Sequence, residues 1–303
     1  MINNMTNKNI IINMNKNLNE NINENMNRVA GNASVRLIDK FIRAVIWFFS
    51  FIALGFLIWI IVFVFIKGIP HISLSFLTSP NNGKNEGIWP MIINTLFIVV
   101  TSLAISIPVG IGAAIYLVEY SKPGKVINTI RFAVETLAGI PSILYGLFGL
   151  IFFVTIMKLS FSILAGALTL SIMVLPTVIR TTEEALKSIP SSYREGSFAL
   201  GATKLFTIRK VVLPCAVPGI LTAVILSTGR IVGETAAVFL TAGMGRNIAR
   251  NIMESGRTLS VHLYILAKEG ISFDKSYATA TVLIILIAII NMASSRLAAR
   301  MKK

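Results

Sequence analysis

The sequence predicts an all-α integral membrane protein with six membrane-spanning helices. The 303 residues are 54% hydrophobic and only 14% charged, and the mean hydropathy is +0.76, far above that of water-soluble domains. Residues 44–66 carry no charge over 23 positions. A helix of that length covers about 34 Å and crosses a hydrocarbon core of about 30 Å. A soluble globular enzyme is therefore excluded.

Five further apolar runs complete the predicted set of spans. They lie at about 91–117, 137–157, 161–179, 220–241 and 277–294, and proline and glycine inside them are tolerated where neighbouring helices satisfy the freed backbone groups. Together they predict a membrane domain over residues 41–299, followed by a short basic tail at 300–303. Six crossings place both termini on the same side of the membrane.

The distribution of basic residues predicts which side that is. The chain has 28 Lys and Arg against 13 Asp and Glu, a formal net charge of +15. With both termini in the cytoplasm, the predicted inner loops and tails near the spans hold 17 basic residues and the outer loops hold eight. Basic residues are retained on the cytoplasmic face, so we expect an N-in, C-in topology and no nucleic-acid partner.

Residues 1–40 form an asparagine-rich segment. The first 32 positions contain 13 asparagines, a composition that cannot bury enough apolar surface to offset the entropy of ordering. We expect a disordered cytoplasmic tail; a partner-binding arm or an aggregation-prone segment are the alternatives. The first span is too long for a cleavable signal peptide and is expected to remain in the mature protein.

The residues needed for catalysis or metal binding are missing. One cysteine, Cys215, and two histidines, His71 and His262, provide neither a disulfide nor a zinc site. The sequence has no nucleophile with a matching base and no phosphate-binding G-x-x-x-x-G-K-[ST] loop. We therefore expect no cofactor, no metal and no enzymatic activity, which leaves transport or a scaffold role.

The polar cytoplasmic loop at 180–214 is the longest polar interruption in the membrane region. Thr181 with Glu184, and Ser192 with Glu195, have the spacing of capping boxes and predict the starts of two short helices. Such a structured loop favours a docking surface, although two helices lying on the membrane surface without a partner would give the same pattern.

Three further residues divide this loop. Pro190 is expected to separate the two short helices, and Gly201 permits a left-handed turn or a close helix contact. Pro214 is expected to end the loop helix before the chain re-enters the membrane.

Arg230 and Glu234 are charged residues within the predicted fifth span. Each costs about 2.5 to 3.5 kcal/mol to insert at membrane depth, so such residues normally face a bundle interior or a watery cavity. Their spacing predicts one helix face, where they can neutralise each other. A structural ion pair is one interpretation; the other is that Arg230 offers a fork suited to an oxyanion and Glu234 holds it in place.

The outer loop between the last two predicted spans carries a short helix. Residues 258–266 have apolar side chains at helical spacing and predict an amphipathic helix on the outer surface. His262 is interpreted as a structural polar residue at an interface rather than a proton relay. Together with Arg257 it would shape an outer docking surface.

One motif in the polar loop carries a family resemblance. The residues Glu195-Gly196-Ser197, then Gly201 after three intervening residues, and Leu213-Pro214 at the far end resemble the EAA loop of ABC-importer permeases, E-A-A-x3-G-x9-I-x-L-P. The departures are Gly196 and Ser197 for alanine and Val211 for isoleucine. The resemblance implies the type I importer permease fold and a loop that docks in a cleft of a separate ATPase subunit, which would explain the missing nucleotide-binding loop.

Three segments, 137–150, 229–235 and 255–264, resemble the phosphate-specific members of that family, most closely the A-type subunit. The resemblance implies a bacterial cytoplasmic-membrane importer of inorganic phosphate, built from two paralogous permeases, an ATPase dimer and an extracytoplasmic phosphate-binding protein, with Arg230 and Glu234 on the path. The paralogous second subunit, or a permease for another oxyanion, is the alternative. A secondary transporter is disfavoured because no second acidic residue lies within the predicted spans to relay a proton.

Overall fold

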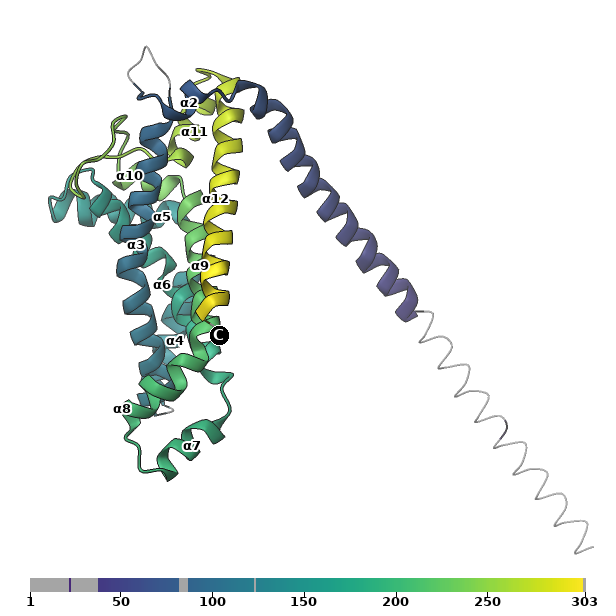
Figure 1. Cartoon of the computed structure of the whole chain (residues 1–303), viewed down its shortest axis with the longest axis vertical. Coiled ribbons are helices and arrows are strands. Elements are labelled where there is room, and N and C mark those ends of the chain that lie inside the picture. Colours follow the sequence, from purple (N-terminus) through teal and green to yellow (C-terminus); the bar gives the residue numbers. More distant parts are fainter. Residues whose placement is uncertain (1–21, 23–37, 82–86, 123, 302–303) are drawn as a thin grey trace, which may run out of the picture. The chain divides into compact units, whose positions relative to one another are not determined.

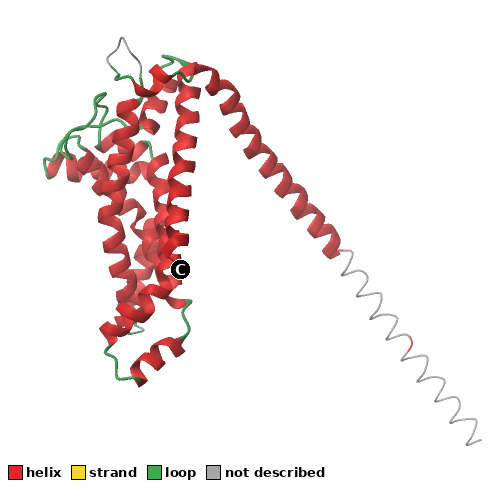
Figure 2. Cartoon of the chain, viewed as in Figure 1, coloured by secondary structure: helices red, strands yellow, loops and turns green. Residues whose placement is uncertain are grey.

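The computed structural model describes residues 22, 38–81, 87–122 and 124–301, and every regular element in these ranges is helical (Figures 1 and 2). The chain divides into two compact units, Met1–Phe63 and Val64–Lys303. The asparagine-rich segment lies almost entirely outside the described residues.

Within the described ranges, five helices are long and apolar enough to cross a membrane, and a bent helix pair makes a sixth crossing if it counts as one span. This confirms the all-helical membrane fold. The five helices are Ile38–His71, Trp89–Tyr120, Ile163–Lys187, Lys204–Gly233 and Phe273–Arg296.

Three of these helices form the centre of the second unit. Helix α3 (Trp89–Ile115) packs along α6 (Ile163–Lys187), and α6 packs along α9 (Leu213–Gly233). Lipid is as apolar as leucine, so membrane helices associate through close packing and hydrogen bonds rather than hydrophobic burial. Accordingly, Ser171 donates to the Ser102 carbonyl oxygen at 2.9 Å, across the contact between α6 and α3.

The predicted span at 137–157 is not one continuous helix. The chain forms α4 (Lys125–Ala138), breaks, and continues as α5 (Ser142–Gly149) with the π-helical turn η3 (Leu150–Ile156), bent by 100° from α4. Pro141 at the break has no N–H to donate and disfavours helical geometry in the residue before it. The apolar run continues through the break, so composition alone does not reveal it.

The helix α6 extends further than predicted. It continues to Lys187, so Thr181 lies inside the helix and starts no new one; the first predicted capping box is wrong. Residues 180–187 are mostly good helix formers, and Lys187 reaches back to Glu183 at 2.7 Å with i to i+4 spacing, which supports the helix beyond its apolar part.

The α7–α8 knob, residues 190–207, follows α6. Helix α7 (Ser191–Ala199) begins directly after Pro190 without a side-chain cap, so Pro190 separates the helices as predicted, whereas the capping role of Ser192 is wrong. Gly201 has a φ of +83°, which confirms the predicted left-handed turn and is a conformation that glycine adopts without strain.

The chain then continues into the membrane without the predicted stop at Pro214. The short helix α8 (Lys204–Thr207), the π-helical turn η4 (Ile208–Val212) and α9 form one continuous helical segment. Pro214 lies at the start of α9, directly after the turn. A π-helical turn is a known way to accommodate a residue that cannot make the regular hydrogen bond.

A second break lies at the C-terminal end of α9. The sequence predicted a helix to residue 241, but α9 ends at Gly233 and a separate helix, α10 (Ala236–Thr241), follows. The chain continues through a loop into α11 (Leu259–Lys268) and α12 (Phe273–Met301). The helix expected at 258–266 is present as α11. It packs against α12 and α3, so it is largely buried, and the predicted position on the surface is wrong.

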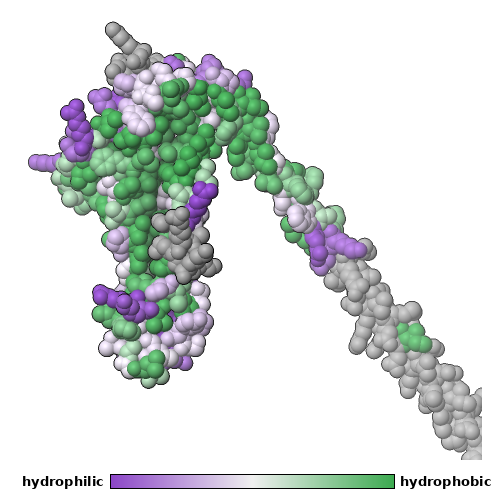
Figure 3. Space-filling model, in the orientation of Figure 1, coloured by the Kyte–Doolittle hydropathy of each residue, from purple (hydrophilic) through white to green (hydrophobic). Residues whose placement is uncertain are grey.

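The surface of the second unit has the distribution expected of a membrane protein. In Figure 3, hydrophobic residues cover the middle of the bundle, and more polar residues gather at the end that carries α7 and α8. Two short segments, η1 (Ile69–His71) and α2 (Leu74–Thr78), belong to the opposite end.

Replacing Gly149 by alanine is expected to weaken the packing of α5 on α6. A Cβ atom there would overlap the Thr169 side chain and lie 2.8 Å from Thr241 Cγ2, and overpacking of this kind costs about 1–3 kcal/mol. Thermal unfolding of the detergent-solubilised protein measures the loss. Gly112→Ala in α3 is the control, because nothing lies within 4 Å of the added atom; equal melting temperatures for the two variants would contradict the tight contact.

Candidate functional site

Arg230 and Glu234 lie on opposite sides of the break at the end of α9. Arg230 is half-buried in the last turn of α9, whereas Glu234 has an extended backbone, with ψ of 128°. The Glu234 carboxylate accepts a hydrogen bond from the Ala237 N–H at 3.1 Å and so caps α10. Carboxylates are favoured at a helix start, where backbone N–H groups are unpaired.

The predicted ion pair between these two residues is therefore wrong, because the helix that would place them on one face ends between them. Among the ion pairs that the structure records in its described ranges, none involves Arg230. The half-buried guanidinium has no carboxylate partner in this part of the chain.

The two broken helices meet beside Arg230. A Cβ at Gly146 of α5 would lie 2.9 Å from the Ala237 Cα of α10, so the two short helices are in close backbone contact. The neighbouring Tyr145 donates its hydroxyl to the Leu137 carbonyl oxygen at 2.7 Å, and this hydroxyl lies within electrostatic range of Arg230. Non-helical backbone at membrane depth is tolerated where protein or a water-filled cavity surrounds it.

Helix α11 also reaches this break. Ser260 donates its hydroxyl to the Glu234 carbonyl oxygen at 2.7 Å. The sequence predicted neither Tyr145 nor Ser260 as part of the site, although both lie in the segments 137–150 and 255–264 that carry the family resemblance.

Arg257 and His262 form a buried polar pair outside the membrane-spanning helices. Arg257 is 7% exposed and donates to the Met244 carbonyl oxygen at 3.2 Å, and its Nη1 lies 3.3 Å from His262 Nδ1. Burial, together with the charges of Arg257 and Arg246, lowers the pKa of His262 to about 4. His262 is thus neutral at ordinary pH, which favours the structural interpretation over a proton relay.

Asn94 and Thr95, which the sequence did not single out, hold the loop between α10 and α11 against α3. The fully buried Asn94 side chain donates to the Asn247 carbonyl oxygen at 2.9 Å and accepts from the Ala249 N–H at 2.9 Å. Thr95 Oγ1 accepts from the Leu259 N–H at 3.0 Å. Two adjacent polar residues inside an apolar run are the signal that could have identified them.

The predicted docking residues of the polar loop separate into two groups. Glu195, Gly196, Ser197 and Gly201 lie together on the α7–α8 knob, and Ser197 Oγ lies 2.8 Å from Thr207 Oγ1. Leu213 and Pro214 lie beyond the knob, at the start of α9.

A groove of about 660 Å³ runs between α7 and the following residues and is lined by Gly196, Ser197 and Gly201 among others. Large apolar side chains stand exposed around it, and Leu200 is 90% exposed. Exposed apolar groups gathered on a polar end of the molecule are typical of a protein-binding surface.

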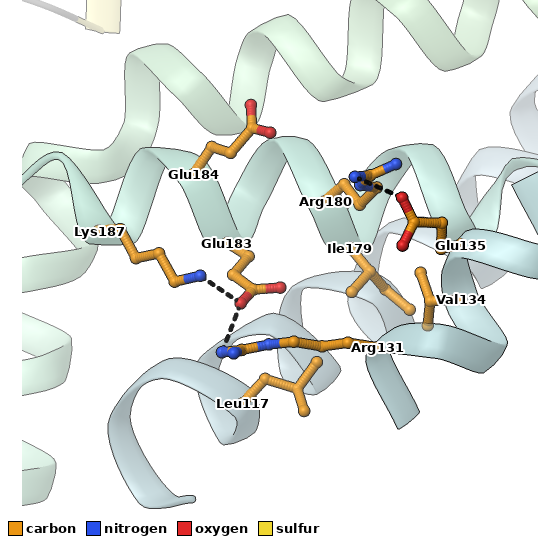
Figure 4. Close-up of a pocket in the computed structure, with 9 residues that line it drawn as sticks. All are labelled: Leu117, Arg131, Val134, Glu135, Ile179, Arg180, Glu183, Glu184 and Lys187. Carbon is orange, nitrogen blue, oxygen red and sulfur yellow. Dashed lines mark hydrogen bonds and ion pairs between the residues drawn. The ribbon is translucent and has the colours of Figure 1, made fainter. Parts of the chain in front are cut away.

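A charged cavity of about 200 Å³ lies between α4 and the end of α6 (Figure 4). The side chain of Glu183 is 9% exposed, and its Oε1 forms ion pairs with Arg131 Nη2 at 2.8 Å and with Lys187 Nζ at 2.7 Å. A third ion pair joins Arg180 Nη2 to Glu135 Oε1 at 3.4 Å. Opposite charges compensate one another here, so the cluster joins α4 to α6. It was missed because residues 180–187 were expected to form part of a loop.

Comparison with solved structures identifies the fold class. The structure of a bacterial ABC transporter that imports the acidic polysaccharide alginate matches with a TM-score of 0.60 and 17% identity, over 85% of this chain and 96% of that one. A methionine ABC transporter in an inward-facing conformation matches with a TM-score of 0.57 and 23% identity, over 75% and 100%. The fold is that of an ABC type I importer permease.

Sequence comparison identifies the family. Residues 106–303 match the model described as binding-protein-dependent transport system inner membrane component, and the chain belongs to this family. It is a multi-pass protein of the cytoplasmic membrane, related to permease subunits that work with a separate ATPase and a binding protein.

Individual relatives include the probable ABC transporter permease YqgI of Bacillus subtilis, 30% identical over 86% of this chain and 94% of that protein. The phosphate transport permease PstA 1 of Mycobacterium tuberculosis is 35% identical over 69% of both chains. A PstA homologue of Mycoplasma pneumoniae is 36% identical over 82% of this chain, which spans 40% of that longer protein.

The His262 environment predicts a stability that decreases as the solution becomes more acidic. Because the pKa of folded His262 is about 4, below its ordinary value of about 6.5, unfolding takes up a proton between these two values. The stabilisation is complete above pH 6.5 and is lost as the pH falls towards 4, by about 3 kcal/mol at most. In His262→Gln, the fall in melting temperature across this range should be smaller.

Melting temperatures of the detergent-solubilised protein from pH 7 to pH 4 test this. The control is Asn128→Gln, a substitution at an exposed position of α4 that changes no titratable group; this variant should keep the pH dependence of the wild type. An unchanged pH dependence in His262→Gln would contradict the prediction.

Proposed function

We propose that this chain is the A-type permease subunit of an ATP-driven importer of inorganic phosphate. The observation that carries the proposal is Arg230, a half-buried guanidinium without a carboxylate partner in the described ranges, at the point where two broken helices meet. A permanently charged planar fork suits a phosphate oxyanion. The phosphate permeases among the relatives support this choice of substrate.

The proposed assembly contains a paralogous permease as heterodimer partner, an ATPase dimer and an extracytoplasmic phosphate-binding protein. The EAA-like residues Glu195, Gly196, Ser197 and Gly201 would dock the ATPase, and the groove beside them supports this. Leu213 and Pro214 would connect that surface to α9. The proposed orientation is N-in, C-in, which places the α7–α8 knob in the cytoplasm, beside the ATPase.

The proposed mechanism is alternating access. Closure of the ATPase dimer on ATP would displace the α7–α8 knob and shift the balance between outward-open and inward-open states. Arg230 would compensate the charge of phosphate during passage, and Glu234, held at the start of α10, would keep the broken backbone in place. Weak binding is required, since phosphate must also leave on the inner side.

Arg230→Ala is expected to reduce phosphate uptake by roughly ten- to a hundredfold, the effect of losing charge-assisted hydrogen bonds of about 1.5–3 kcal/mol. Uptake of radiolabelled phosphate in cells, with membrane levels of the protein confirmed, provides the measurement. Arg296→Ala, at an exposed position near the end of α12, is the matched control and should transport normally. Undiminished uptake in Arg230→Ala would remove this residue from the path and favour a scaffold role.

The docking proposal is tested at Gly201. Gly201→Val should disrupt the left-handed turn and abolish co-purification of the ATPase, because a β-branched residue is strained at positive φ. Gly196→Ala is the control: open space surrounds the added atom, and alanine restores the residue of the EAA pattern. If Gly201→Val is inserted in the membrane and still retains the ATPase, the docking role is wrong.

A further inference from the structure

The α7 helix packs against α8 and the π-helical turn η4, which lead into α9. None of its residues is fully buried, and the bond between Ser197 and Thr207 lies within the knob. Lys204 of α8 lies over the Tyr120 ring, 4.8 Å from its centroid, but Lys204 is exposed. A displacement of α7 needs a further connection if it is also to move α3 and α6.

Arg194 supplies that connection. Its Nε and Nη2 donate to Glu119 Oε1 at 3.0 and 2.7 Å. Its Nη1 donates to the Ile189 carbonyl oxygen and Nη2 to that of Leu186, both at 3.0 Å. One guanidinium on α7 therefore joins the last turn of α6 and Glu119, which lies in the π-helical turn η2 (Tyr116–Tyr120) at the end of α3.

This contact differs from an ordinary surface salt bridge. The side chains are only 19% and 8% exposed, whereas exposed ion pairs contribute little to stability. The carbonyl groups at the end of a helix favour a cation, and the fork geometry uses several donors at once. Lysine, a compact charge on a flexible stem, cannot reproduce this set of bonds.

We propose that the ion pair of Arg194 with Glu119 is the joint through which movement of α7 reaches α3 and α6. Arg194 is a positioning residue: it holds α7 to two helices that are packed along each other. A displacement of α7 then moves α3 and α6 together, instead of being absorbed by the Pro190 and Gly201 turns. The inference rests on the proposed function, since it needs an ATPase that moves α7.

The test measures how tightly transport is coupled to ATP hydrolysis. The complete transporter, with its co-purified ATPase, is reconstituted in vesicles with the phosphate-binding protein, and phosphate imported and ATP hydrolysed are measured together. In Arg194→Lys and in Glu119→Gln, the phosphate imported per ATP should fall by about tenfold, as expected for one lost charge-assisted contact, while co-purification of the ATPase stays within about twofold of wild type. The double variant should be no worse than either single one, because both remove the same contact.

Arg209→Lys is the matched control, an arginine exposed in η4, and should keep the wild-type ratio. A structural role alone would lower import and hydrolysis together and leave the ratio unchanged, which would overturn the joint. Loss of ATPase co-purification in Arg194→Lys would also overturn it, since Arg194 would then serve docking.

The wild-type protein separates this inference from the proposed function. If the wild type neither retains an ATPase nor imports phosphate, the proposed function itself fails. If the wild type does both and Arg194→Lys behaves in the same way, only the role of the Arg194–Glu119 ion pair is refuted.

Discussion

Backbone groups inside a membrane must find partners within the protein, since lipid supplies none. This chain interrupts two helices at neighbouring places, and side chains satisfy the groups that are freed. The Tyr145 hydroxyl binds a carbonyl oxygen at the end of α4, and the Glu234 carboxylate binds an N–H at the start of α10. Because Glu234 is used to hold the second break, it is not the partner of Arg230. The lack of a carboxylate partner for Arg230 in the described ranges is thus a consequence of how the second break is stabilised.

That arrangement also bears on the energetics of passage. A charged arginine at membrane depth costs about 2.5 to 3.5 kcal/mol on insertion scales, and the described ranges offer no carboxylate that would offset this cost. A close partner carboxylate would compete with an incoming anion, and a deep set of several cations would retain it. A single half-buried guanidinium lies between these extremes, which would suit the proposed role of Arg230 in a step that must both accept and release phosphate.

The sequence predicted the all-helical membrane fold well, because span length and hydropathy are local properties, and the E-G-S…G…L-P spacing marked the exposed knob. The breaks were harder to predict. Pro141 gave a local signal within an otherwise continuous apolar run, but nothing near Glu234 indicated that its carboxylate would cap a new helix. The Thr181 motif misled, because a threonine followed by glutamate three residues later also occurs inside helices. Arg194 escaped notice because its partner Glu119 is 75 residues away.

The position of the second break links the two proposed sites. One side of it ends a continuous helical segment that begins at Lys204, within the knob, and runs to Gly233, so in the proposed mechanism a displacement of α8 would be carried to Arg230. The other side is anchored elsewhere: α10 contacts α5 at Gly146, and Ser260 of α11 binds the Glu234 carbonyl oxygen. Arg230 would therefore move with the knob, whereas Glu234 belongs to the part held by α5 and α11. Under alternating access, the distance between these two residues would change without any bending of α9, and the charge presented to phosphate would differ between the two states.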